Sequence, residues 1–245
     1  MDEAVYREMY EIEDRFWWFA AKRGVLLHLI RRFHPEAGSR RLSVCDIGCG
    51  CGALLAALSR CHDAIGIDAS PTALAFCRKR KLNVAQGELP ARVLLAPRSV
   101  DIVVLSDVLE HVDEDRASVV AAAGLLRPGG LLICTVPACP WLWTRHDESH
   151  HHRRRYTRAR FATLFDDLPL NVRVMSYYNS FLFPAMILMR LIARLSKSDR
   201  AGLGLHVPSP PLNGLLRRVF ESEKHLLTLL SLPIGGSLIS VHQAE

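Results

Sequence analysis

The sequence predicts a doubly wound α/β fold, in which a mostly parallel sheet is covered by helices on both faces. Short apolar segments typical of buried strands alternate with helical segments between residues 42 and 178. This alternation gives a parallel sheet, because each strand needs a crossover to reach the next one. The length of 245 residues and the hydrophobic fraction of 49% suit one α/β domain with additions.

A strand that ends in a glycine-rich turn is the most informative feature. Residues 44–52 read VCDIGCGCG, and a helical segment follows at 53–58. Such glycines leave backbone amides bare at a helix N-terminus, where nucleotides and nucleosides bind. The spacing also fits the dinucleotide fingerprint G-x-G-x-x-G/A. Asp46 argues against a pyrophosphate, because its charge would repel one, whereas a ligand with an ammonium group and no phosphate would tolerate it.

Two later segments extend this pattern. A second buried strand, 64–68, ends in Asp68, 18 residues after Gly50, where an acid can accept both hydroxyls of a ribose. Residues 101–112, DIVVLSDVLEHV, predict a strand that ends in an acid-rich turn. The segment 125–130 ends a helix and opens the next strand, at 131–136.

In this order and at this spacing, the motifs DIGCGCG, IGIDAS, SDVLEHV and LRPGGLLICTVP resemble the class I S-adenosylmethionine-dependent methyltransferases. The resemblance covers about residues 42–137. It implies a Rossmann-like sheet of seven strands, mostly parallel, whose one antiparallel strand is the last. It also implies S-adenosylmethionine as the cofactor. The residues that it places around the cofactor are Asp46, Gly48, Gly50, Gly52, Asp68, Ala69, Glu88, Leu89, Ser106, Asp107 and Val108.

Each group in this set has an expected place along the cofactor. The glycine turn and Asp46 line the methionine and ribose end, and Asp68 holds the ribose hydroxyls. Glu88 lies near the adenine amino group. Residues 106–108 close the floor near the transferred methyl group.

We expect residues 1–245 to form one methyltransferase domain with three parts. These are an N-terminal helical cap at 1–36, a core at 42–180 and 236–243, and a helical insertion at 181–232. Four consecutive aromatic residues at 16–19 cannot all face one side of a helix, so Trp17 and Trp18 are expected to serve both the core and the pocket. A helix that only packs on the sheet is the equal alternative to a lid over the cofactor.

A narrower resemblance extends over most of the chain. Residues 16–19 with Arg23, the segment 141–147, the segment 151–157 and PIGGS at 233–237 resemble a subgroup of bacterial small-molecule methyltransferases of the type 11/12-like group. Its members often accompany sugar, polysaccharide or lipid modification. The residues that we expect in the substrate site or the lid are Trp17, Trp18, Arg23, Trp141, Trp143, His152, Arg155 and Tyr156.

The basic character of the chain is concentrated in one segment. The formal charge is +6, and residues 145–160 contain six arginines and four histidines. The planar guanidinium fork suits phosphate or carboxylate, so an anionic small molecule or a lipid headgroup is the first expectation. A solvated surface is the second. Nucleic acid is the last and is not expected as a partner, because aromatic residues are not interleaved as stacking platforms.

A hydroxyl acceptor must lose its proton when it is methylated, and histidine is the usual base near neutral pH. The candidate bases are therefore His111, His146, His151 and His152, with Asp147 to orient one of them. His111 could equally be a residue near the cofactor without a role as a base, and the histidines at 150–152 could be surface residues. No metal is expected, because neither the cysteines nor Asp147, His151 and His152 have the spacing of a metal motif.

The location of the protein is predicted from three features. The acidic start of the chain has no signal-peptide pattern, and the seven cysteines form no disulfide framework, so we expect the cytoplasm. The apolar segment 181–195 is too short to span a bilayer. Arg190 and Arg194 share one face of it, so a peripheral membrane contact is the alternative to packing in the core or over the substrate.

These observations predict S-adenosylmethionine-dependent methyl transfer to a small-molecule acceptor. A hydroxyl of a sugar, lipid or natural-product intermediate is preferred, and methylation of nitrogen or carbon is the alternative. Two other classes remain open: a nicotinamide-dependent oxidoreductase and a non-catalytic cofactor-binding partner of a membrane enzyme.

Overall fold

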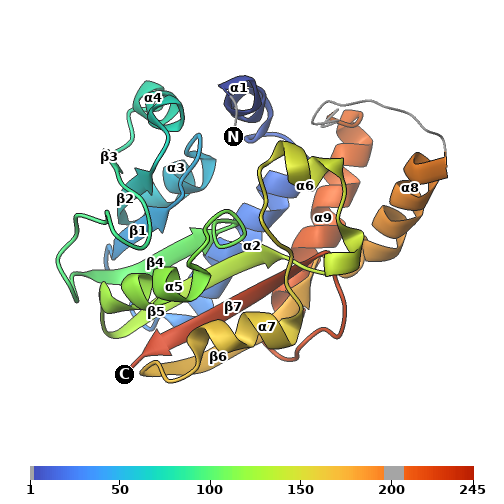
Figure 1. Cartoon of the computed structure of the whole chain (residues 1–245). Coiled ribbons are helices and arrows are strands. Elements are labelled where there is room, and N and C mark those ends of the chain that lie inside the picture. The colour runs from blue at the N-terminus through green and yellow to red at the C-terminus, as the bar shows by residue number, and fades with distance from the viewer. Residues whose placement is uncertain (1–2, 196–206) are drawn as a thin grey trace.

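The structure is a computed structural model that describes residues 3–195 and 207–245. Seven strands form one sheet in the order β3-β2-β1-β4-β5-β7-β6 (Figure 1). The bounds of the strands are β1 Ser43–Ile47, β2 Asp63–Asp68, β3 Val84–Gln86, β4 Val100–Ser106, β5 Leu126–Pro137, β6 Leu170–Tyr178 and β7 Ser237–Ala244. Strands β1 to β5 pair in parallel, and β7 runs antiparallel to both β5 and β6. The predicted fold class, with its one antiparallel strand, is therefore confirmed.

Helices cover both faces of this sheet. In the part of the chain that the structure describes, their bounds are α1 Glu3–Ile12, α2 Trp17–Phe33, α3 Ala53–Ser59, α4 Pro71–Lys79, α5 Asp115–Gly124, α6 Arg145–Ser149, α7 Arg158–Ala162, α8 Phe183–Leu195 and α9 Pro210–Leu226. Short 3₁₀ turns occur at Pro140–Leu142 and Thr163–Phe165. Helices α5 and α7 lie on the near face of the sheet in Figure 1, and α2 lies behind it.

Two hydrophobic cores lie on opposite faces of the sheet, and alternate residues of each strand feed them. Val44 and Ile102 belong to the core beneath α2, whereas Cys45 and Val103 belong to the core beneath α5. All four side chains are fully buried. Because both faces are covered, the central strands β1 and β4 are buried along nearly their whole length, as expected of parallel sheets.

Helix α9, from the predicted insertion, packs on α2. Phe220 of α9 is fully buried, and its ring lies 5.1 Å from that of Trp18 and 5.7 Å from that of Tyr178. These contacts join the N-terminal and C-terminal additions beside the sheet. The division of the chain into a cap, a core and an insertion stays a prediction.

Helix α8 bears on the predicted membrane contact. Leu188 and Met189 are 58% and 71% exposed. The side chains of Arg190 and Arg194, on which that prediction depends, lie outside the described residues. Among the described residues, no helix combines the length and the apolarity needed to cross a bilayer.

The strand order fixes where a ligand can bind. The chain passes from β1 outward to β2 and β3, and then returns to place β4 on the other side of β1. Crossovers that diverge from neighbouring strands leave a crevice at the carboxyl ends of those strands. The glycine turn after β1 and the acid-rich turn after β4 meet at this crevice.

A buried histidine in β7 predicts how stability depends on pH. His242 is fully buried and stacks on Phe165 at 3.9 Å, and neither ring nitrogen has a hydrogen-bond partner among the described residues. Burial lowers the pKa of His242 from 6.5 to about 4. The unfolded chain therefore takes up this proton at a higher pH than the folded chain does. We expect this residue to cost about 3 kcal/mol of stability as the pH falls from 7 to 4.

Urea unfolding at several pH values, for wild type and His242→Leu, measures this effect. The difference between the two free energies of unfolding should shift in favour of the leucine variant as the pH falls through that range. A difference independent of pH contradicts the prediction. Because only the difference is used, the other titrating groups cancel.

Candidate cofactor and acceptor site

A cavity of about 580 Å³ lies at the carboxyl ends of β1, β2 and β4. Helix α2 and the segment after α6 complete its walls. Most of the predicted site residues line it, namely Trp17, Trp18, Arg23, Asp46, Gly48, Gly50, Asp68, Ala69, Glu88, Leu89, Ser106, Asp107, Val108, His111, His152 and Arg155. Its size and partly apolar lining suit a small-molecule ligand.

The glycine turn contains positions that a residue with a side chain could occupy only with strain. Gly48 has a φ of +75°, and a Cβ atom there would lie 2.4 Å from Cγ2 of Val108. Gly50 has a φ of +55°, which also favours glycine, and it lines the cavity. Asp68 fixes the turn from the next strand: its Oδ2 accepts the Gly50 N–H at 2.9 Å, and its Oδ1 accepts the Ser70 N–H at 2.9 Å.

Asp46 contributes a buried, incompletely satisfied carboxylate to the cavity. It is 1% exposed, and its Oδ2 has no hydrogen-bond partner among the described residues. Burial raises the pKa of Asp46 to about 7, although Lys22 opposes this shift. An orphaned carboxylate oxygen beside a glycine turn suits a ligand ammonium group and disfavours a phosphate. The residues present therefore fit the nucleoside cofactor that the sequence predicts.

Lys22 is a site residue that the sequence analysis missed. Its Nζ donates to the Asp107 carboxylate, which also accepts from Oγ1 of Thr135 at 2.8 Å. Burial raises the pKa of Asp107, but Lys22 outweighs it and holds this pKa below its usual value. Lys22 lies one helical turn after Trp18, so its spacing could have placed it on the pocket face of the same helix.

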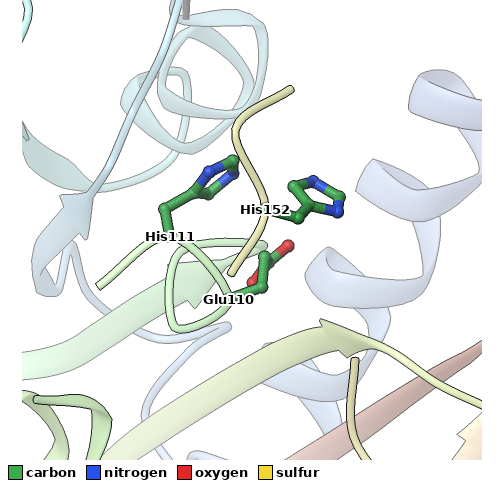
Figure 2. Close-up of side chains that lie close together, drawn as sticks. All are labelled: Glu110, His111 and His152. Atoms are coloured by element: carbon green, nitrogen blue, oxygen red, sulfur yellow. The ribbon is translucent and has the colours of Figure 1, made fainter. Parts of the chain in front are cut away.

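Three polar side chains meet at the end of the cavity opposite the glycine turn. Glu110 and His111 follow β4, and His152 follows α6 (Figure 2). The rings of His111 and His152 lie 4.8 Å apart, nearly perpendicular to each other. Burial, with the neighbouring His152, lowers the pKa of His111 to about 4, so its ring is neutral near pH 7.

Glu110 was also missed by the sequence analysis. It is fully buried, and neither of its carboxylate oxygens has a hydrogen-bond partner among the described residues. Burial, with Asp107 nearby, raises the pKa of Glu110 well above its usual value. No local sequence signal identifies it, because its isolation depends on segments that pack over it from elsewhere in the chain.

Asp147 holds two of the cavity residues in place. It is fully buried; its Oδ1 lies 2.9 Å from Nδ1 of His152 and accepts from Nε of Arg155 at 2.7 Å. Burial raises the pKa of Asp147, but His152 and Arg155 outweigh it and hold this pKa well below the usual range. Asp147 thus orients a histidine, as the sequence analysis suggested, from behind the cavity wall.

Several predicted residues do not line the cavity. Gly52 faces the interior, where a Cβ would lie 2.7 Å from Leu82. Tyr156 is fully buried, with its hydroxyl 3.0 Å from the Leu109 carbonyl. Trp141 is 58% exposed beside Phe183.

The remaining candidates lie in the segment between β5 and α7, residues 138–156, which we call the excursion after β5. Trp143 turns toward Glu148, and His151 is an exposed turn residue. His146 belongs to α6, but its side chain lies outside the described residues. The predicted roles of Trp143 and His151 have no support from the cavity, because neither residue lines it.

Aspartates of this chain pair with most of the arginines in the basic segment 145–160. Arg153 pairs with Asp113, and Arg154 and Arg160 share the Asp115 carboxylate. Of the arginines at 145–160, Arg155 alone lines the cavity, among the described residues. The expected binding of an anionic ligand stays a prediction.

Comparison with known proteins agrees with the fold. Residues 45–134 match the family model described as a methyltransferase domain. A ubiquinone biosynthesis O-methyltransferase of Cupriavidus pinatubonensis is 40% identical over 101 residues, which cover 38% of this chain and 41% of that protein. The chain thus spans less than half the length of the curated relative that it matches.

Solved structures match over a larger share of the chain. An S-adenosylmethionine-dependent methyltransferase from Mesorhizobium loti matches with a TM-score of 0.57 and 14% identity, over 88% of this chain and 95% of that one. Another from Archaeoglobus fulgidus matches with a TM-score of 0.54 and 15% identity, over 90% and 94%. At such identities the likeness shows the fold. Residues 45–134 therefore match a methyltransferase domain, and the chain has the fold of the class I S-adenosylmethionine-dependent methyltransferases.

Proposed function

We propose that this protein transfers the methyl group of S-adenosylmethionine to a hydroxyl of a small-molecule acceptor. One observation carries the proposal: a single cavity joins the Gly48–Gly50 turn and Asp68 at one end to His111 and His152 at the other. A cofactor at the first end and an acceptor at the second would share one enclosed space. Methyl transfer requires such a shared space, because it is an in-line displacement that depends on orientation.

The proposed cofactor contacts follow from the groups at the first end. The Asp68 carboxylate would accept the ribose hydroxyls, and Asp46 would face the ammonium group of the methionine part. Glu88 and Leu89 lie on the β3 side of the cavity, where the adenine would bind. S-adenosylmethionine supplies an activated methyl group and leaves as S-adenosylhomocysteine.

The acceptor end supplies groups that can bind a hydroxyl and receive its proton. The neutral ring of His111 has a nitrogen lone pair for this purpose, and Asp147 fixes the ring of His152 beside it. Trp17 and Trp18 line the same cavity and would exclude water around the acceptor.

Two observations favour methylation of oxygen over methylation of nitrogen or carbon. Paired histidines are useful for a hydroxyl that must lose a proton, whereas an amine needs little more than desolvation. In addition, the curated relative is named an O-methyltransferase. A sugar, lipid or natural-product intermediate is the proposed acceptor class, and the exposed apolar residues of α8 support a lipid-linked form.

Calorimetric titration with S-adenosylmethionine, S-adenosylhomocysteine and NAD in parallel tests the cofactor assignment. We expect micromolar binding of the two sulfur nucleosides and no binding of NAD. Binding of NAD alone would favour an oxidoreductase. Tight cofactor binding without turnover on any acceptor would favour a non-catalytic partner protein.

Gly50→Arg is expected to abolish cofactor binding in the same titration, because a long side chain at this backbone position would fill the cofactor end of the cavity. Gly38→Arg is the matched control, since Gly38 is exposed and a Cβ there would meet nothing within 4 Å. Unchanged binding by a folded Gly50→Arg protein would contradict the assignment.

A further inference from the structure

The acceptor end holds a set of potential metal ligands that the sequence analysis did not identify. Glu110, His111 and His152 each offer one ligand atom, and these atoms lie within 4.8 Å of one another (Figure 2). The sequence analysis weighed Asp147, His151 and His152 instead and expected no metal. The fold replaces that set, because it turns His151 outward and brings the turn after β4 against His152.

We propose that Glu110, His111 and His152 bind a divalent transition-metal ion of the zinc class. Two imidazoles and one carboxylate are a donor set that suits Zn²⁺, Co²⁺ or Mn²⁺ better than Mg²⁺ or Ca²⁺, which prefer oxygen ligands alone. Three protein ligands leave at least one coordination position open, which is typical of catalytic rather than structural sites.

The state of Glu110 is the independent observation that points to a cation. A fully buried carboxylate whose two oxygens lack partners is costly unless a positive charge compensates it. The nearby cations do not serve this purpose, since Lys22 is paired with Asp107 and Arg155 with Asp147. Neither cation donates a hydrogen bond to Glu110, and a bound divalent ion would supply the partner that its carboxyl oxygens lack.

The surroundings of His152 resemble those of a metal ligand. Its Nδ1 lies 2.9 Å from Oδ1 of Asp147, which leaves Nε2 for an ion. Metal-binding histidines commonly use their second nitrogen in this way, with a carboxylate that fixes the ring. Arg155 in turn holds Asp147, so the orientation is set by a buried network.

The three ligand atoms must draw together when an ion binds. Atoms bound tetrahedrally at about 2.1 Å from a metal lie about 3.4 Å from each other. The ligand atoms lie within 4.8 Å of one another, so a side-chain movement of at most about 1 Å is required. His111 and His152 are both partly exposed to the cavity, which leaves room for it.

The proposed ion deepens the proposed function and rests on it. The site lies in the wall of the shared cavity, so an acceptor with oxygen donors would bind on the open side of the ion. A metal ion lowers the pKa of a hydroxyl that it binds, so the hydroxyl can release its proton to solvent. His111 would then be a ligand of the ion instead of the base. The acceptor class is then a phenol or alcohol with a second oxygen nearby, and the two imidazoles hold the ion.

Metal binding is measured without cofactor, so it is independent of methyl transfer. Protein treated with EDTA is titrated with Zn²⁺ by calorimetry and with Co²⁺ by visible absorption, which reports the ligand field. We expect one ion per chain. His152→Ala and Glu110→Gln should each weaken binding by about 100-fold or more, since each removes a direct ligand.

His225→Ala is the matched control, because His225 is an exposed histidine of α9 that neither lines the cavity nor belongs to the ligand set. It should bind as wild type does. Absence of binding by folded wild-type protein, or equal binding by folded His152→Ala, would overturn the metal site. Thermal unfolding with and without Zn²⁺ gives a second readout: the ion should raise Tm in wild type and not in Glu110→Gln.

Cofactor titration of the metal-free protein separates the two proposals. Loss of S-adenosylmethionine binding in wild type would contradict the proposed function and leave the metal site standing. Cofactor binding without metal binding would support the proposed function and contradict the proposed metal site.

Discussion

Replacing Asp68 with alanine is expected to weaken S-adenosylmethionine binding by about 100-fold. Charge-assisted hydrogen bonds contribute about 1.5–3 kcal/mol each, and the ribose hydroxyls of the cofactor would lose the proposed hydrogen bonds to the Asp68 carboxylate. The substitution also removes the acceptor for the Gly50 N–H, which lies 2.9 Å from Oδ2. The glycine turn would therefore be less ordered before the cofactor arrives, and this adds to the loss.

Calorimetric titration of the variant with S-adenosylmethionine measures this loss. Asp63→Ala is the matched control, because Asp63 begins the same strand, at the end remote from the cavity, and its side chain is 70% exposed. The control should bind the cofactor as wild type does. If folded Asp68→Ala also retained wild-type affinity, the assignment of Asp68 to the ribose would be wrong.

Replacing Asp147 with alanine is expected to lower the free energy of unfolding by about 3–5 kcal/mol, because it leaves a buried guanidinium without its partner. The Arg155 side chain is only 5% exposed and donates to Asp147 at 2.7 Å. Asp147 also accepts from the backbone N–H of Thr144 at 2.9 Å, so the turn before α6 loses its anchor as well. The ring of His152 would lose its fixed orientation at the same time.

Chemical denaturation of Asp147→Ala and of Asp113→Ala measures how much the loss of stability depends on the burial of the ion pair. Asp113 also pairs with an arginine of the basic segment, but its side chain is 68% exposed and that of Arg153 is 51% exposed. Exposed pairs contribute about 0–1 kcal/mol, so this control should be nearly neutral. Equal losses in the two variants would contradict the role of the buried network.

Much of the fold was predictable because local patterns and topology agree. Buried strands, crossover helices and the glycine turn each have a short-range signal, and connection rules then fix a parallel sheet. The positive φ values of Gly48 and Gly50 are local requirements of the turn between β1 and α3. Asp68 was predictable for the same reason, since it ends a strand at a fixed distance from that turn.

The acceptor end was less predictable, because its residues come from segments far apart in the chain. Lys22 reaches Asp107 across 85 positions, and His152 meets His111 through the excursion after β5. A run such as HHHRRRY carries no signal for which side chain turns inward. Tyr156 became a core residue and His151 an exposed one, and this difference depends on packing against Leu109 and α5 rather than on local sequence.

The sequence by itself determined the class of fold and the glycine turn at the cavity, because these follow from periodicity and glycine spacing. The strand that runs antiparallel was implied by the resemblance to a known family. Only the tertiary structure decided which charges are paired. It matched most of the basic segment with aspartates and left Glu110 without a hydrogen-bond partner among the described residues, beside two histidines. The physical reason is that burial and pairing are properties of a position in space, and they set the cost of a charge far more than its neighbours along the chain do.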